Sequence, residues 1–396
     1  MTQLDRRQVL RLLAAAGMAG TAGPALAGCG SSQASGSTDS APVRIGLIVP
    51  QAGAGKPIGD DLTAGFQLYL TMHGNQLGGH PVQVVVAEEG ETAETGRAAV
   101  DRLVRESAVH AMAGVVSSTV MSGIRDQVES AQVPLLGTNA SPSSLGSVKY
   151  IWRTSYVNSE AGSALGGYLA NRRGQSAYVI SDDSAIAREQ VNGFLAAFQG
   201  VSGHPPLAGE RVQVPATESM GTYVDEIKSS GARNVFAAFT SDGAIAFYRA
   251  YHAAGMSAPL YSPGFVTEGA AAIKQVGEAA SGVYTSMNYG PDLDNNANRL
   301  FAATYQKTYN NPPSTYAVAA FDAGMVLDKA IQLCGSDFNP RAINAALSSV
   351  GQIDSPRGAW QFNQSRTPLQ RWYLRQVRKD GQVLANTLLG DLGMLG

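Results

Sequence analysis

Short apolar runs and amphipathic stretches alternate along most of the chain. Residues 43–49 form an apolar run that ends at Pro50, which is typical of a buried strand. A glycine-rich loop follows, and residues 60–72 then place their large apolar side chains on one side at helical spacing. The same alternation predicts strands at 82–87, 111–116 and 133–137 and helices at 94–106 and 120–130.

The alternation of predicted strands and helices begins again after Arg153. It predicts helices at 161–171, 188–198 and 244–254 and strands at 176–180, 235–239 and 260–262. Helices at 298–309 and 316–333 follow, and late strands are predicted at 360–362 and 372–378, with a hairpin turn at Lys379-Asp380-Gly381. Strand–helix alternation at this spacing favours parallel, doubly wound sheets, and 396 residues suit two such α/β units.

The N-terminus has the pattern of an export signal. Arg6 and Arg7 stand in a segment similar to the twin-arginine motif, and a weakly apolar stretch at 12–26 is too short for a good membrane span. Leu26-Ala27-Gly28-Cys29 resembles the bacterial lipobox, in which the signal peptide is cut before the cysteine and the thiol is acylated. We therefore expect a signal peptide at residues 1–28 and a lipid on Cys29.

Residues 29–42 are predicted to be a flexible tether. From Gly30 to Pro42 the chain is rich in glycine and serine and cannot bury a core. At Gly/Ser stiffness this run spans roughly 20 Å. The sequence thus predicts a folded body held on the extracytoplasmic face of the cell membrane by a lipid anchor.

Composition and charge narrow the possible functions. Hydrophobic residues make up 44% of the chain and charged residues 15%, which indicates a globular protein. The formal net charge is -2 and the body holds no lysine- or arginine-rich stripe, so no nucleic-acid partner is expected. If Cys29 is acylated, Cys334 has no disulfide partner and is interpreted as an inert core thiol.

Motifs for catalysis are lacking in the sequence. Gly53-Ala54-Gly55-Lys56 fails the phosphate-loop pattern, no GxSxG elbow occurs, and the histidines are scattered without metal-ligand spacing. The acid pairs Asp60-Asp61 and Glu88-Glu89 are interpreted as solvated loop residues. We expect no catalytic residue, no metal and no cofactor.

Several short motifs occur in an order and spacing typical of one family. They are Asn75-Gln76-Leu77-Gly78-Gly79, Gly114-Val115-Val116-Ser117-Ser118-Thr119, Asn139-Ala140-Ser141, Pro291-Asp292-Leu293-Asp294-Asn295 and Phe321-Asp322-Ala323. On these motifs, residues 43–385 resemble the type I periplasmic binding proteins, in their branched-chain amino acid (leucine-binding protein) branch.

The resemblance implies two doubly wound parallel-sheet α/β lobes joined by a three-crossing hinge. Lobe 1 would hold residues 43–154 plus 286–366, and lobe 2 residues 155–285 plus 367–396, with crossings near Thr154, Thr285 and Thr367. The lobes would close over a small molecule in the cleft. The partners would be that ligand, the permease and ATPase subunits of an ABC importer, and the membrane through the lipid anchor.

In the first lobe the resemblance points to two binding loops. Ser117, Ser118 and Thr119 lie where a helix begins, and its free N–H groups and the hydroxyls suit a carboxylate. A plain N-cap is the alternative interpretation. Asn139, Ala140 and Ser141 follow the next strand, and an Asx or serine turn is the alternative there.

The second lobe departs from the amino-acid binders of the family. Ile186 stands in a loop where the family usually has a tyrosine, and Phe265 follows a glycine where some leucine binders have a glutamate for the ligand ammonium. Asp183 or Asp242 would have to replace that charge, since an unpaired buried ammonium costs several kcal/mol. Tyr156 and Tyr289 lie near the crossings, where they would stack on a ligand or pack the hinge.

These substitutions favour a small carboxylate with an apolar tail. An aromatic or aliphatic acid and a branched-chain amino acid fit about equally. A ligand-sensing module for a membrane receptor and an amide or urea binder remain alternatives.

Overall fold

The computed structural model describes residues 42–172, 176–206, 211–214 and 219–396. The predicted signal peptide, Cys29 and the tether up to residue 41 lie outside the described residues. Ser40–Gly396 forms one compact unit. All elements below belong to it.

The first sheet has the order β2-β3-β1-β4-β5-β6. Its pairs are parallel except for the short β2, which is antiparallel to β3. The strands are β1 (Val43–Val49), β2 (Gln76–Leu77), β3 (His80–Glu88), β4 (Ala111–Gly114), β5 (Leu135–Gly137) and β6 (Ile151–Arg153).

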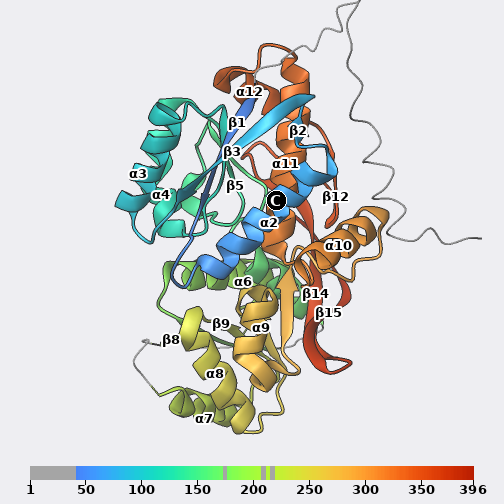
Figure 1. Ribbon diagram of the computed structural model, residues 1–396. Helices are drawn as coiled ribbons and strands as arrows, with labels where there is room; N and C mark the ends of the chain where they lie inside the picture. The colour runs from blue at the N-terminus through green and yellow to red at the C-terminus, as the bar shows by residue number, and fades with distance from the viewer. Residues whose placement is uncertain (1–41, 173–175, 207–210, 215–218) are drawn as a thin grey trace, which may run out of the picture. The chain divides into compact units, whose positions relative to one another are not determined.

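Helices cover both faces of this sheet. In Figure 1, α3 (Ala93–Asp101) and α4 (Ser118–Ala131) lie on one side, and α2 (Lys56–Met72) and α11 (Thr315–Cys334) on the other. The helices α2 and α11 approach closely at Gly65, where a Cβ atom would lie 1.9 Å from the carbonyl oxygen of Ala317. Only glycine permits that contact, which explains a glycine in mid-helix.

The second sheet has the order β12-β13-β14-β11-β10-β9-β7-β8, with β15 paired to β14. Its strands are β7 (Tyr178–Asp182), β8 (Arg211–Val214), β9 (Val235–Ala238), β10 (Leu260–Pro263), β11 (Tyr284–Met287), β12 (Ile353–Ser355), β13 (Gly358–Phe362), β14 (Pro368–Asp380) and β15 (Val383–Leu395). Strands β7 to β11 pair in parallel, and the later strands are antiparallel.

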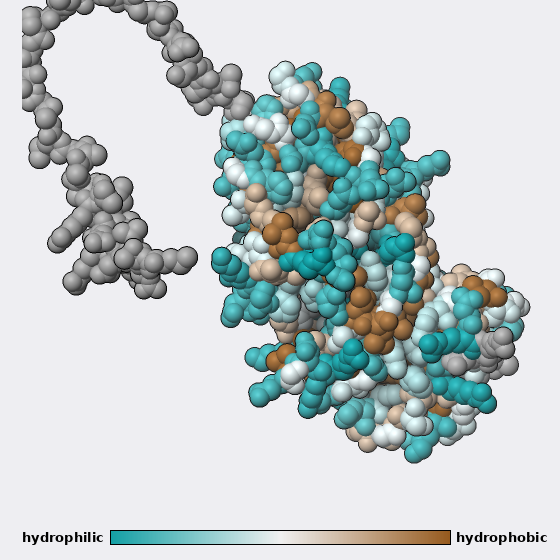
Figure 2. All heavy atoms as spheres, turned by 90° about the vertical axis from the view of Figure 1, so that its right-hand side faces the viewer, coloured by the Kyte–Doolittle hydropathy of each residue, from teal (hydrophilic) through white to brown (hydrophobic). Residues whose placement is uncertain are grey.

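Two apolar cores flank this sheet as well. The helices α5 (Glu160–Ala170) and α6 (Ala185–Ser202) pack on one face, and α7 (Met220–Ser230) and α8 (Ser241–Ala253) on the other. The chain thus forms two doubly wound α/β layers, as the alternation predicted. Figure 2 shows a face on which apolar groups are small and separated by hydrophilic residues.

The C-terminal elements connect the two layers. The helices α10 (Asn296–Tyr309) and α12 (Pro340–Leu347) add Phe301 and Ile343 to the first core. Strand β12 pairs with β13, and β13 pairs with the start of β14, yet Trp360 of β13 packs into the same first core. Of the expected crossing residues, Thr154 follows β6, Thr285 lies in β11 and Thr367 precedes β14, and all three are buried.

Some predicted elements differ in detail. The helix expected at 94–106 ends at Asp101 and continues as a π-helical turn, η1 (Arg102–Glu106). The hairpin turn lies one residue later than predicted, because Asp380 still pairs with Val383 and Gly381 takes the left-handed conformation at φ 62. The sequence prediction missed β2, β6, β8, β11, β12, β15, α7, α9 (Ala270–Val276) and α12.

Candidate ligand-binding cleft

A cleft of about 620 Å³ lies at the carboxyl ends of the parallel strands of both sheets. Its walls include Val116 and Asn139, which follow β4 and β5, and Phe239 and Pro263, at the ends of β9 and β10. Ligands of open α/β sheets bind outside the carboxyl ends of the strands. The strand topology therefore makes this cleft the candidate binding site.

The structure brings a part of the predicted site residues together. Those that line the cleft are Ser118, Asn139, Ala140, Tyr156, Ile186, Asp242 and Phe265. The others are absent from its described lining: Ser117, Thr119, Ser141, Asp183 and Tyr289. The predicted loops thus reach the cleft, but only through some of their side chains.

Ser117 is the N-cap of α4. Its hydroxyl accepts a hydrogen bond from the N–H of Val120 at 3.3 Å, as in the alternative interpretation of this serine. Ser118 is the first helical residue and lines the cleft, and its hydroxyl accepts a bond from Asn158 at 3.5 Å. The N–H groups of Ser118 and Thr119 belong to the first turn and have no intrahelical acceptor.

Glu89 lies behind this helix start. Its carboxylate accepts the N–H of Val116 at 2.8 Å and the N–H of Ser117 at 2.7 Å, and the side chain is fully buried. Burial raises the pKa of Glu89 to about 7, although the two N–H donors act in the opposite direction. The prediction that Glu88-Glu89 is a solvated pair is therefore wrong for Glu89.

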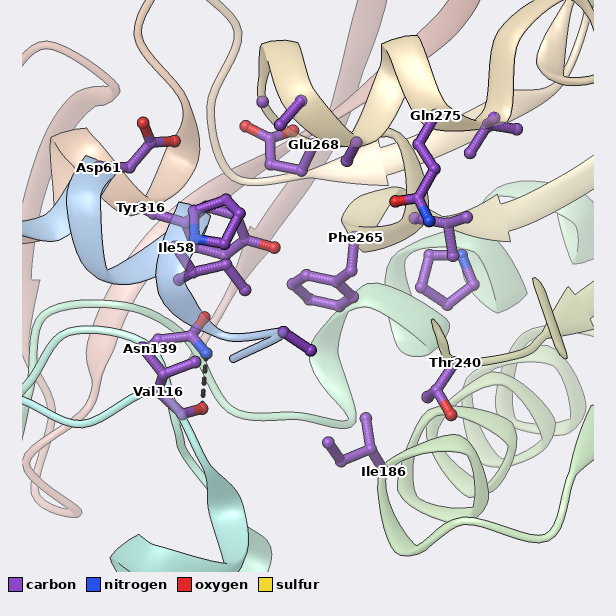
Figure 3. Close-up of a pocket in the computed structure, with 18 of the residues that line it drawn as sticks. Ile58, Asp61, Val116, Asn139, Ile186, Thr240, Phe265, Glu268, Gln275 and Tyr316 are labelled. Carbon is purple, nitrogen blue, oxygen red and sulfur yellow. Dashed lines mark hydrogen bonds between the residues drawn. The ribbon is translucent and has the colours of Figure 1, made fainter. Parts of the chain in front are cut away.

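The second binding loop is fixed by internal hydrogen bonds. The amide of Asn139 donates to the carbonyl of Val116 at 2.8 Å, as the dashed line in Figure 3 shows, and its oxygen accepts from the hydroxyl of Tyr156 at 2.6 Å. Ser141 is buried, and within the described residues its hydroxyl has no hydrogen-bond partner. This loop therefore offers the cleft a rigid polar edge.

An apolar wall faces these loops. Phe265 belongs to the 3-10 turn η3 (Gly264–Thr267), and its ring centroid lies 5.0 Å from that of Tyr156. Figure 3 shows Phe265 between Ile58 and Tyr316 on one side and Ile186 on the other. Because these side chains come from separate elements, the wall encloses the middle of the cleft with apolar surface.

Two other predicted residues, Tyr289 and Asp183, do not line the cleft. Tyr289 is fully buried, and its hydroxyl donates to Asn298 at 2.8 Å, so it packs in the first core. Asp183 is exposed, whereas its neighbour Asp182 accepts the N–H and hydroxyl of Thr240 at 2.6 and 2.8 Å. Asp182 thus fixes the start of α8, and Asp183 lies outside the cleft lining.

The glycine before Phe265 has a steric cause. A Cβ atom at Gly264 would lie 2.6 Å from Nη2 of Arg375. The acid of this wall stands at Glu268 instead, where one oxygen accepts the N–H of Thr315 at 2.6 Å and the other pairs with Arg375 at 2.8 Å. Both side chains are almost fully buried, with exposed fractions of 3% for Glu268 and 1% for Arg375.

The charged side chains of the lining are all acidic: Asp60, Asp61, Asp242 and Glu268. Asp60 is exposed and pairs with Lys56 at 2.6 Å. Burial raises the pKa of Asp61 to about 6, while hydrogen bonds from Ser314 at 2.5 Å and Tyr305 at 3.3 Å act in the opposite direction. The interpretation of Asp61 as a solvated loop residue is therefore wrong.

Helix starts supply the positive potential that the lining side chains lack. The first turns of α2, α6 and α8 contribute Pro57, Ile186 and Asp242 to the walls, beside Ser118 of α4. A helix N-terminus carries about half a positive charge and free N–H groups. The cleft can therefore hold a small anion by backbone dipoles.

Residues 42–382 match the family model of the periplasmic binding proteins. The chain belongs to the periplasmic binding protein family.

The similarity extends over most of this binding protein. It is 28% identical over 348 residues to a Leu/Ile/Val-binding protein homolog of Brucella suis, covering 85% of this chain and 88% of the relative. A solute-binding protein of an ABC transporter from R. palustris, solved in complex with benzoate, is 26% identical with a TM-score of 0.77, covering 89% and 97%. An ABC transporter substrate-binding protein from Sphaerobacter thermophilus is 25% identical with a TM-score of 0.81, covering 88% and 97%.

These comparisons confirm the predicted family and the fold of two parallel-sheet α/β lobes. The family consists of substrate-binding proteins rather than enzymes, which confirms the predicted binding role. In the part of the chain that the structure describes, no group of three or more His, Cys, Asp or Glu side chains could hold a metal. No helix of that part is long and apolar enough to cross a membrane.

Proposed function

We propose that this binding protein is the lipid-anchored, extracytoplasmic substrate-binding component of an ABC importer, and that it captures a small monocarboxylate with an apolar tail. One observation supports the proposal most strongly. The same cleft is lined by Ser118, in the first turn of α4 with its free N–H groups, and by the apolar wall around Phe265. The benzoate complex of the R. palustris relative supports an aromatic acid.

The charge of the lining favours a single carboxylate. The described lining holds no basic side chain, so a ligand anion would meet only neutral donors: backbone N–H groups, hydroxyls such as that of Ser118, and side-chain amides such as those of Gln190 and Gln275. A second carboxylate would face Asp61 or Asp242, and like charges at close range repel. Monocarboxylates should therefore bind better than dicarboxylates of similar size.

A branched-chain amino acid is the second candidate. Asp61 lines the cleft beside the apolar wall and offers a carboxylate to an ammonium group, a role that the sequence suggested for Asp183 or Asp242. The Leu/Ile/Val-binding protein homolog of Brucella suis supports this candidate. Asp242 lines the cleft too and stays a candidate, while Asp183 lies outside it.

Closure of the cleft would occur between lobe 1 (43–154 plus 286–366) and lobe 2 (155–285 plus 367–396). Among the hydrogen bonds that cross between these proposed lobes, two are accepted by glutamates at the cleft side. Glu189 of α6 accepts the hydroxyl of Ser143 at 3.0 Å, and Glu268 accepts the N–H of Thr315 at 2.6 Å. Hinge motion about Thr154, Thr285 and Thr367 would break and re-form them.

A thermal-shift screen tests the ligand class. Benzoate, 4-hydroxybenzoate, cinnamate, L-leucine and L-phenylalanine would be compared with benzamide and phthalate, and a ligand at 100 times its Kd adds about 2.7 kcal/mol of stability. We expect a monocarboxylate to raise Tm while benzamide and phthalate do not. Stabilisation by benzamide alone, or by none of the compounds, would contradict the proposal.

Anchoring and import require separate tests. Cys29→Ser should release the protein from membranes, and Arg6→Lys combined with Arg7→Lys should block export, since the pair is proposed as a receptor-read address. Deletion of the gene should abolish uptake of the identified ligand. Membrane retention of Cys29→Ser would exclude the lipid anchor, and unchanged uptake would favour a sensing role.

A further inference from the structure

Glu89 is a buried acid outside the cleft lining that nevertheless holds the start of α4. It directly follows β3, and it is fully buried. Its two oxygens accept two consecutive backbone N–H groups, those of Val116 and Ser117, at 2.8 and 2.7 Å. Bonds of N–H groups to an ionised carboxylate are stronger than bonds to a neutral acceptor.

The loop held in this way is strained. Gly114 has φ 119 and Val115 has φ 70, both in the left-handed region. A β-branched residue rarely adopts this conformation, and such backbone persists only where its surroundings fix it. The bent backbone directs the N–H groups of Val116 and Ser117 toward Glu89. The strained conformation at Gly114 and Val115 and the hydrogen bonds to the carboxylate therefore occur together.

The same loop sets the position of the second binding loop. Its carbonyls at Gly114 and Val115 accept the N–H groups of Thr138 at 2.9 Å and Ala140 at 3.0 Å. The carbonyl of Val116 accepts the side chain of Asn139 at 2.8 Å. Three successive carbonyls of the strained segment therefore hold the residues that form the polar edge of the cleft.

We propose that Glu89 is the positioning residue of the ligand cleft, which fixes the 114–118 loop and through it the 138–140 loop; the ligand-binding half of this inference rests on the proposed function. The role requires a carboxylate. A glutamine has one acceptor oxygen, and its NH₂ group would face the second N–H. A single-atom change at Glu89 should thus disturb both loops without touching the cleft wall.

Hydrogen exchange tests the positioning role without any ligand. At a pH above the pKa of Glu89, Glu89→Gln would be compared with the wild type and with Glu91→Gln, an exposed acid two residues away. We expect exchange at Val116 and Ser117 to become about tenfold faster or more, since bonds to a charged group contribute about 1.5–3 kcal/mol. Strand β9 and the Glu91→Gln protein should keep wild-type rates.

Uniform acceleration over the whole chain would overturn the proposal, because Glu89 would then contribute only to global stability. Unchanged exchange at Val116 and Ser117 would overturn it too. Should Glu89→Gln fail to fold, Glu89→Asp provides the same comparison, because it keeps the charge but shortens the side chain. Exchange confined to the two loops is again the expected result.

Binding is the second readout. Calorimetry with benzoate and L-leucine should show an affinity at least about tenfold weaker in Glu89→Gln, while Glu91→Gln matches the wild type. Faster exchange with unchanged affinity would overturn the ligand-positioning role. If the wild type binds neither probe nor any compound of the thermal screen, the proposed ligand class fails, whereas the exchange result still decides whether Glu89 holds the loops.

Discussion

Replacement of Glu268 by glutamine tests the most buried charge of the cleft wall. The glutamate pairs with Arg375 at 2.8 Å, and both side chains are almost completely removed from water. Glutamine has nearly the same shape, and its oxygen can still accept the N–H of Thr315. The substitution therefore removes the charge, and it puts an NH₂ group in place of the oxygen that faces Arg375.

The expected destabilisation is about 3–5 kcal/mol, because the variant leaves the Arg375 guanidinium buried without a counter-charge. That loss is large against the 5–15 kcal/mol that is typical of a folded domain. One contact of Arg375 survives, since its Nη1 also donates to the carbonyl of Tyr289 at 3.0 Å. This contact offers a dipole but no neutralising charge.

Urea denaturation of four proteins measures the effect: the wild type, Glu268→Gln, Arg375→Met and the double variant. The double variant should recover part of the loss, because it removes the buried guanidinium that Glu268→Gln leaves without a counter-charge. A loss below about 1 kcal/mol for Glu268→Gln, or a double variant no more stable than Glu268→Gln, would refute the argument from an unpaired buried charge.

Three further outcomes are expected. Ser117→Ala should lower the free energy of unfolding by about 1 kcal/mol, because it removes the N-cap of α4; an unchanged urea midpoint would contradict this role. Phe265→Ala should weaken binding of benzoate more than of acetate in calorimetry, and equal effects would exclude Phe265 as the contact for the tail. Asp61 has a folded-state pKa of about 6 against an ordinary 3.8, so the native state binds more protons between these values, and the free energy of unfolding should fall as pH rises from about 4 to about 6. Asp61→Asn should make this decline shallower without abolishing it, because the raised pKa of Glu89 acts in the same direction, and an equal slope in both proteins would show that other groups cause it.

The sequence predicted the fold well where apolar residues were continuous. Strand β1 and helix α11 were predicted within a residue of their observed ends, because buried strands and long apolar faces give strong periodic signals. The missed elements give weak signals. Strand β2 has only two residues, and β15 carries a mixture of exposed and half-buried positions, so neither shows a clear alternation.

Only part of the site was predicted. The ends of strands can be recognised in a sequence, whereas contacts between residues that are distant in the chain cannot. Ser118 and Asn139 follow apolar runs, and this placement brought both to the cleft. Asp61 and Glu268 are different, since Ser314 and Arg375, which give them their roles, lie more than a hundred residues away in the chain. Neither acid lies in one of the family motifs, and no local pattern in the sequence distinguishes Asp61 or Glu268 from other acidic residues.

Glu88 and Glu89 show most clearly where local information ends. Glu88 ends β3 and Glu89 directly follows it, yet Glu88 is exposed and accepts the N–H groups of Gln51 and Gly90, whereas Glu89 is fully buried. Their side chains point to opposite sides because neighbouring residues of an extended segment alternate in direction. Only Glu89 points toward the strained turn at Val115. Which of the two glutamates can position the cleft loops therefore depends on a loop that begins more than twenty residues later in the chain.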